Sequence, residues 1–95
     1  MKPLAWNEEK NEWLKRIRHV SFEEAANEIK NKKYLDDIEH PNKEKYAHQR
    51  MWIVDIHGYI YLIPYVEDAE KYFLKTIIPS RKAVKTYRRK KKEVI

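Results

Sequence analysis

The sequence MWIVDIHGYIYLIPYV, residues 51–66, decides the fold of this chain. Its two halves are rich in β-branched and aromatic residues, which favour strands at 51–56 and 59–66. Between them, His57-Gly58 fits the two-residue turn of a β-hairpin. We therefore expect an antiparallel hairpin at the centre of a sheet.

A two-residue turn also fixes which side chains lie opposite one another. One face is expected to carry large pairs: Trp52 with Ile63, Val54 with Tyr61, and Ile56 with Tyr59. The other face carries Ile53 opposite Leu62, so both faces are largely apolar and should be covered. Pro64 has no N–H to donate, which predicts an edge or a bulge beside it.

Two helices are predicted before the hairpin. Asn7 can cap the first helix, and Ser21 with Glu24 has the spacing of a capping box that opens the second. Apolar residues of the second helix recur at the spacing of one helical face: Phe22, Ala25, Ala26 and Ile29. Both helices therefore need an apolar surface to cover.

Further elements flank the hairpin on both sides. Short strands are predicted at 34–38 and 72–78, and Ser80 can cap a last helix over 81–89. The predicted fold class is α+β, with two N-terminal helices and a C-terminal helix packed on a three- to four-stranded, mainly antiparallel sheet.

Composition narrows the possible functions. The chain has 95 residues, which we interpret as one domain over 1–95 with a flexible basic tail at 90–95. The absence of cysteine excludes disulfides and thiolate chemistry, and a single glycine excludes glycine-rich phosphate loops. No apolar run has the length of a membrane span, and the first residues turn polar too soon for a signal peptide. We expect a cytoplasmic protein without a metal or cofactor.

Positive charge is concentrated at one end of the sequence. The net charge is +6, yet residues 81–95 hold eight basic residues against Glu93 alone, so residues 1–80 are close to neutral. Such a segment is typical of a surface that binds phosphates or an acidic partner. For the basic residues from Arg88 to Lys92, a solvated tail that serves only solubility is an equal alternative.

Three stretches resemble a known family. Residues 6–11 read WNEEKN and residues 20–26 read VSFEEAA, and together they resemble the opening of the BrnT toxins. Residues 75–83, KTIIPSRKA, are similar to the final strand and basic helix of that family. The sequence departs from the family at Asn7, where the family has Asp, at Arg18-His19 and at Pro79. We interpret the N-terminal motif as helix capping.

The resemblance implies both a fold and a function. It implies a RelE/ParE-like fold and the toxin of a type II toxin–antitoxin pair, an endoribonuclease that cuts mRNA and arrests translation. It also implies a DNA-binding antitoxin, of the ribbon-helix-helix type, that covers the toxin. Two alternatives remain open: a non-enzymatic inhibitor of DNA gyrase, as in the ParE branch, and a nucleic-acid-binding co-repressor.

RNA cleavage without a metal requires a base, an acid and cations fixed against the phosphate. Histidine and tyrosine can transfer protons, and arginine and lysine bind phosphate oxygens. The candidate catalytic residues are Arg81, Lys82, Tyr87, His48 and Arg50. The candidate RNA-binding residues are Lys75, Lys85, Arg88 and Arg89.

Each candidate also has an alternative role. Arg81 and Lys82 could bind an acidic antitoxin segment, and Arg50 could form a surface ion pair near Tyr65. Tyr87 could be a core residue and His48 a solvated loop residue.

Two further sites can be written from the sequence. A metal site from His40, His48 and Asp36 or Asp37 has a spacing that matches no ligand motif. Tyr59, Tyr61 and Tyr65 share a strand face, where they could stack RNA bases or line a helix-covered core, and the core is the better explanation.

Overall fold

The fold is described here from a computed structural model, which covers residues 1–93 and the side chains of residues 1–87. Over these residues the chain forms an α+β domain, as predicted. The helices are α1 (Glu8–Ile17), α2 (Phe22–Lys30) and α3 (Arg81–Glu93). The strands are β1 (Leu4–Ala5), β2 (Asp36–Glu39), β3 (Arg50–Ile56), β4 (Tyr59–Glu67), β5 (Tyr72–Leu74) and β6 (Ile78–Pro79).

The hairpin of β3 and β4 forms in the predicted register. Trp52 pairs with Ile63, Val54 with Tyr61, and Ile56 with Tyr59. The turn has φ of 52° at His57 and 86° at Gly58, as a two-residue turn with two left-handed residues requires. The Asp55 carboxylate accepts a hydrogen bond from the Gly58 N–H and so closes the turn.

The sheet is larger than the three to four strands that the sequence predicts. Its strand order is β1-β5-β4-β3-β2, and β6 also pairs with β4. The prediction missed β1, which lies parallel to β5, because a two-residue strand shows no periodicity. It also joined β5 and β6 into one strand over 72–78.

Pro64 explains why this last strand is divided. The Lys75 N–H donates to the Pro64 carbonyl at 2.8 Å, but Pro64 has no N–H to return to Lys75. Leu74 pairs with Tyr65, and Ile78 pairs with Leu62. From the first pair to the second, the chain advances by four residues from β5 to β6 but by only three residues along β4. The extra residue makes a bulge beside Pro64, which is one of the two alternatives, edge or bulge, that the sequence predicts.

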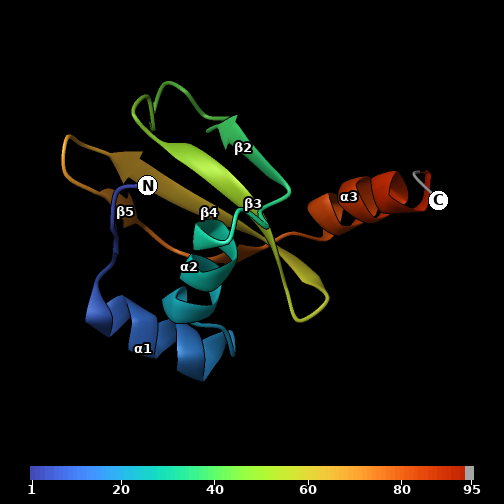
Figure 1. Cartoon of the computed structure of the whole chain (residues 1–95), viewed down its shortest axis with the longest axis horizontal. Coiled ribbons are helices and arrows are strands. Elements are labelled where there is room, and N and C mark those ends of the chain that lie inside the picture. The colour runs from blue at the N-terminus through green and yellow to red at the C-terminus, as the bar shows by residue number, and fades with distance from the viewer. Residues whose placement is uncertain (94–95) are drawn as a thin grey trace.

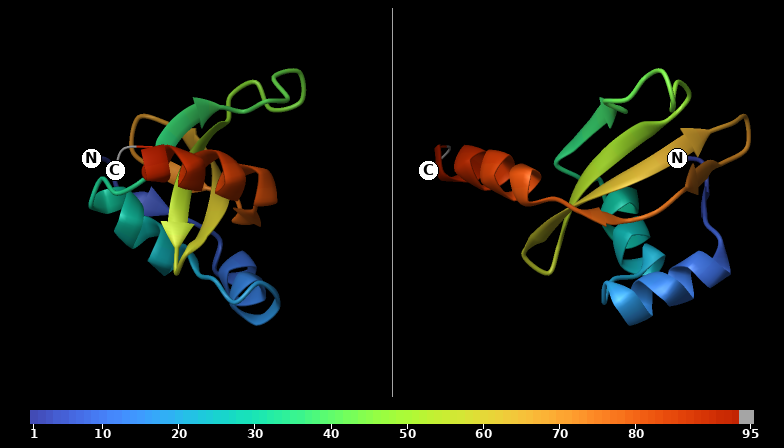
Figure 2. Two further views of the ribbon diagram at one scale, coloured as in Figure 1. Left: turned by 90° about the vertical axis from the view of Figure 1, so that its right-hand side faces the viewer. Right: turned by 180° about the vertical axis from the view of Figure 1, so that it is seen from behind.

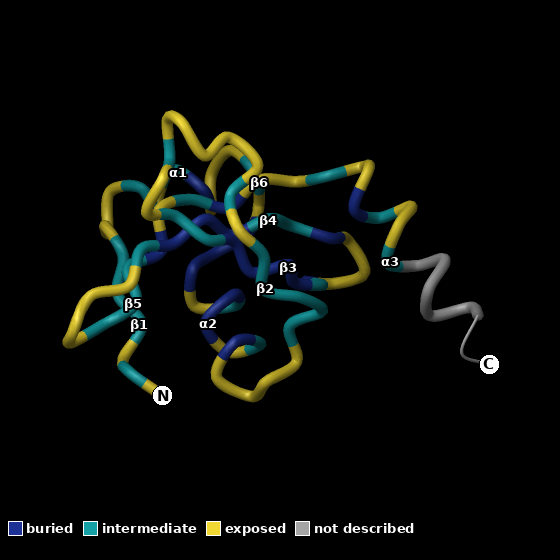
Figure 3. Tube along the Cα trace, turned by 90° about the horizontal axis from the view of Figure 1, so that it is seen from above, coloured by how far each residue is buried: buried dark blue, intermediate teal, exposed yellow. Residues whose placement is uncertain are grey.

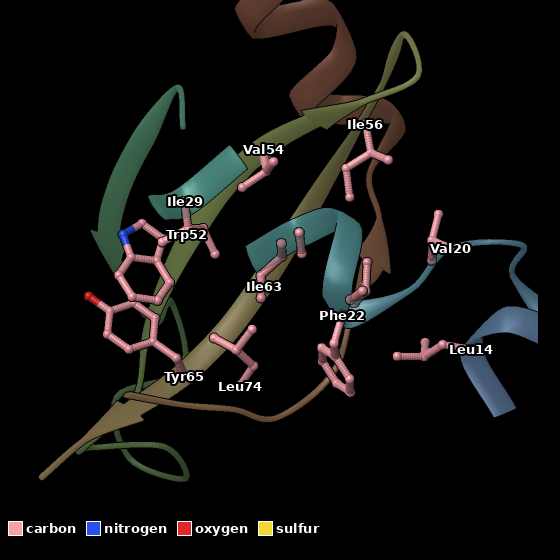
Figure 4. Packing of buried hydrophobic residues seen from close by; sticks show 12 residues of the cluster. Leu14, Val20, Phe22, Ile29, Trp52, Val54, Ile56, Ile63, Tyr65 and Leu74 are labelled. Carbon is pink, nitrogen blue, oxygen red and sulfur yellow. The ribbon is translucent and has the colours of Figure 1, made fainter. Parts of the chain in front are cut away.

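Both faces of the hairpin are covered, as its apolar pattern predicts. Helices α1 and α2 lie on one face and α3 meets the other before it extends beyond the sheet (Figures 1 and 2). The larger core lies beneath α1 and α2, where Leu14, Phe22 and Ile63 have no exposed surface (Figure 4). A smaller core joins Ile53 and Ile60 of the sheet to Ala83 of α3. Most residues of β3 are buried, whereas most residues of α3 up to Tyr87 are exposed or half-buried (Figure 3).

The N-terminal motif caps the helices, as we interpreted it. The Asn7 side chain accepts from the Lys10 N–H at the start of α1. Ser21 and Glu24 form the predicted capping box, in which each side chain bonds the backbone N–H of the other residue. These bonds satisfy N–H groups that have no partner within the helix.

Asn11 joins the two helices from a fully buried position. Its Oδ1 accepts from the Phe22 N–H at 2.8 Å, and its Nδ2 donates to Glu23 Oε1 at 2.7 Å. The latter bond is the main reason that the pKa of Glu23 lies below its usual value. Asn11 therefore links α1 to the start of α2 by hydrogen bonds, in addition to the apolar core that Leu14 and Phe22 share.

Replacement of Asn11 by alanine should destabilise the domain by about 1–3 kcal/mol, because the buried Phe22 N–H loses its acceptor. Denaturant unfolding followed by circular dichroism measures this loss. Asn27→Ala is the matched control, since Asn27 lies exposed on α2 and should change stability by less than about 0.5 kcal/mol. Equal stability of the two variants would contradict the role given to Asn11.

Candidate functional site

The fold distributes the candidate catalytic residues over two faces of the sheet. Arg50 is on the face of β3 that carries Trp52 and that α2 covers. Arg81, Lys82 and Tyr87 are on α3, which packs against Ile53 on the opposite face. The structure therefore brings Arg50 and His48 together at one place and the α3 residues together at another.

The first place is the basic surface of α3, formed by the exposed side chains of Arg81, Lys82 and Lys85. Ser80 caps the helix, because its Oγ accepts from the Ala83 N–H at 3.1 Å. Within residues 1–87, no acidic side chain forms an ion pair with these three cations. They are therefore available to bind phosphate oxygens or acidic side chains of a partner.

Tyr87 anchors this helix to the sheet. Its hydroxyl donates to Asp36 Oδ2 at 3.1 Å, and its ring packs beside Ile53 and Ala83. Burial, and then the Asp36 carboxylate, raise the pKa of Tyr87 above its usual value. The hydroxyl proton is thus held against Asp36. Tyr87 therefore fits its alternative role from the sequence, that of a core residue.

The remaining RNA-binding candidates are separate from the basic surface of α3. Lys75 is exposed with its ammonium group 5.5 Å from the centre of the Phe73 ring. The Lys75 N–H bonds to Pro64 on β4, whereas the N–H of Ser80, directly before α3, bonds to Ile60. Pro64 and Ile60 are four residues apart on β4, so Lys75 and the start of α3 lie about 13 Å apart along the strand. The side chains of Arg88 and Arg89 lie outside the described residues. So do those of the expected tail at 90–95, although α3 continues to Glu93.

Arg50 forms the ion pair that the sequence offered as its alternative role. Its Nε donates to Asp37 Oδ1 at 3.1 Å, and its Nη2 donates to the Asp37 carbonyl at 2.9 Å. The Tyr65 hydroxyl donates to the same Oδ1 at 2.8 Å. Hydrogen bonding with Tyr65 and Asp37 raises the pKa of Arg50, so the guanidinium stays charged and fixed in direction.

The tyrosines on this face do not form an open stacking platform. Tyr65 is only 3% exposed and stacks on Trp52 at 3.7 Å between ring centres. Tyr72 meets both rings edge-on. Tyr59 and Tyr61 lie further along β4 and contact each other edge-to-face. A covered core, the better explanation from the sequence, thus accounts for Tyr65.

The second place is a hollow of about 380 Å³ under the loop between β2 and β3, which we call the loop pocket. Its polar lining includes His40, Lys43, Tyr46, His48, Gln49 and Arg50. His40 is a sequence candidate for a metal site, and Lys43 is not among the sequence candidates. The signal available in the sequence was the pair of histidines at the two ends of one short loop.

The described residues offer neither a metal cluster nor a membrane-spanning helix. No cluster of three or more histidine, aspartate or glutamate side chains suited to a metal occurs in the described part of the chain. Asp36 and Asp37 point to opposite faces of β2, toward Tyr87 and Arg50 respectively. Among the described helices, none has the length and apolar character needed to cross a membrane.

Comparisons with family models, with curated proteins and with solved structures give no match to this chain.

The phenol of Tyr65 should make stability depend on alkaline pH. Burial first, and then the bond to Asp37, raise the pKa of Tyr65 well above its usual value near 10. The unfolded chain releases this proton near pH 10 and the folded chain does not, so the free energy of unfolding should decline above about pH 10. Denaturant unfolding at pH 8 and pH 11 measures the decline, which Tyr65→Phe should reduce. An unchanged decline in Tyr65→Phe would contradict this assignment.

Proposed function

We propose that this chain is the toxin of a type II toxin–antitoxin pair and an endoribonuclease that cuts mRNA to arrest translation. The proposal gives the basic surface of α3 the role of the RNA contact. It takes the partner to be a DNA-binding antitoxin, of the ribbon-helix-helix type, and requires no cofactor.

The observation that carries the proposal is the basic surface of α3 itself. Arg81, Lys82 and Lys85 are exposed and have no acidic partner among the described residues, while Tyr87 and Ala83 fix the helix on the sheet. The three cations differ in this from Lys2, Lys15, Lys43, Arg50 and Lys71, each of which forms an ion pair. A fixed group of cations without internal partners is what binding to a polyanion requires.

The resemblance to BrnT toxins gives this surface its proposed substrate. Among the residues that carry the resemblance at the N-terminus, Asn7 caps α1, Ser21 caps α2, and Asn11 joins the two helices by its bond to Phe22. Those at the C-terminus contain Arg81 and Lys82. The first motif thus supports a shared fold, and the second supports a shared RNA-binding surface.

One observation favours a second candidate, a non-enzymatic protein that binds gyrase or acts as a co-repressor. Tyr87 is the one tyrosine among the candidate catalytic residues, and its hydroxyl is bonded to Asp36. A protein that only grips its target needs cations and no proton-transfer group. RNA cleavage by the purified chain distinguishes the two candidates.

Combined replacement of Arg81 and Lys82 by alanine should abolish growth arrest when the chain is expressed without its antitoxin. Both side chains are exposed, so the fold should be retained. Arg16→Ala with Lys30→Ala is the matched control, because it removes the same charge from exposed positions on α1 and α2. Growth arrest by the soluble Arg81/Lys82 variant, at the level of the control, would refute the proposed RNA contact.

RNA binding by the unmodified chain should depend steeply on salt. Three phosphate contacts on a single strand predict that the association constant falls by about two powers of ten for each tenfold rise in salt. Fluorescence anisotropy with a labelled single-stranded RNA measures this slope. The same RNA, incubated with and without a chelator, should yield fragments with 2′,3′-cyclic phosphate ends. Intact RNA together with growth arrest would instead support the gyrase-type alternative.

A further inference from the structure

The loop pocket brings together four nitrogen-bearing side chains that are far from the basic surface of α3. His40 and Lys43 come from the start of the loop, and His48 and Arg50 come from its end. All four can donate hydrogen bonds, and the only acidic residue in the lining is Glu39. A set of converging donors fits a ligand that carries several acceptor oxygens.

The loop itself is held by its own backbone bonds. The His40 N–H donates to the Gln49 carbonyl, the Tyr46 N–H to the Asn42 carbonyl, and the Gln49 N–H to the Tyr46 carbonyl. The Asn42 side chain also accepts from the Lys45 N–H. The lining side chains are thus carried by a bonded loop that begins and ends on paired strands.

His40 is fixed in both orientation and tautomer. Its Nδ1 accepts from the Asn42 N–H at 3.1 Å, so the neutral ring carries its proton on Nε2. Its ring packs on Tyr46 with 4.4 Å between ring centres. His40 therefore presents its Nε2–H as a hydrogen-bond donor, and His48 is exposed at the other end of the loop.

The two cations of the pocket can each serve a ligand. Arg50 uses Nε and Nη2 for Asp37, which fixes the guanidinium plane and leaves Nη1 outside those two bonds. Lys43 pairs with Glu39, but both side chains are more than 60% exposed. Such a pair contributes little and can exchange for a better anion.

We infer that the loop pocket binds a phosphate group of the RNA strand, with Arg50 and Lys43 as its cations and His40 as a neutral donor. The inference rests on the proposed function for the identity of the ligand. It assigns the chain two separate phosphate contacts, one at the loop pocket and one on α3. It also adds His40 and Lys43, which the sequence analysis had not placed at an RNA site.

Histidine side-chain NMR tests this inference with an internal control. The chain has four histidines, and His19 and His57 lie outside the loop pocket. Titration with inorganic phosphate, and separately with uridine 3′-monophosphate, should shift the ring signals of His40 and His48 saturably and leave the other two unchanged. Equal shifts in all four signals, or none in His40 and His48, would overturn the inference.

Two variants then test the cations. Arg50→Gln should weaken binding of uridine 3′-monophosphate about tenfold, since a charge-assisted bond to the phosphate is lost. Arg16→Gln on α1 is the matched control and should bind as the unmodified chain does. Lys43→Ala, with Lys30→Ala as its control, tests the second cation of the pocket. Unlike Arg50, Lys43 does not bond Asp37, so its loss leaves that contact intact. Unchanged binding in both Arg50→Gln and Lys43→Ala would overturn the inference.

The outcomes separate this inference from the proposed function. Specific shifts of His40 and His48 without RNA cleavage would keep the phosphate site and remove the nuclease. Cleavage that persists in His40→Ala and His48→Ala, without phosphate shifts in the unmodified chain, would keep the nuclease and remove the phosphate site.

Discussion

The register of the β3–β4 hairpin is the constraint on which the rest of the molecule depends. His57 and Gly58 both adopt left-handed backbone conformations, and only one register closes such a turn. A shift by one residue would exchange the two faces of the sheet and move Trp52 out of the larger core. The same register places Arg50 under the β2–β3 loop and Ile53 beneath α3. Both candidate sites therefore follow from one turn.

Arginine side chains bond backbone groups at the β2 edge of the sheet and directly before β6. On β2, the N–H and the carbonyl of Asp37 face away from β3. The N–H donates to the Asp36 carboxylate, and the carbonyl accepts from Arg50. Directly before β6, the Ile77 carbonyl accepts from Arg18, which caps the C-terminal end of α1, and Pro79 of β6 has no N–H to offer. Unpaired strand edges invite pairing with another chain, and these contacts remove that opportunity.

The two proposed phosphate contacts differ in how they are built. The basic surface of α3 consists of exposed side chains on a helix whose first turns pack against the sheet through Ala83, Val84 and Tyr87. In the loop pocket, by contrast, Arg50 and His40 are each held by hydrogen bonds to neighbouring groups. Exposed cations without partners suit attraction of any polyanion, whereas oriented donors suit recognition of one group in a defined position. RNA held at both places would cross from one face of the domain to the other.

The sequence alone determined the elements whose signals are local. The His57-Gly58 turn, the caps at Asn7 and Ser21, and the alternation along 51–66 each depend on neighbours a few residues away, so they were predicted correctly. Pro64 likewise predicted an edge or a bulge, because a missing N–H is a property of one residue. What only the tertiary structure decided was the separation of Arg50 from Arg81, the pairing of β1 with β5, and the bond from Tyr87 to Asp36. These depend on which segments meet across the sheet, and contacts between distant segments leave no periodic signal in the sequence.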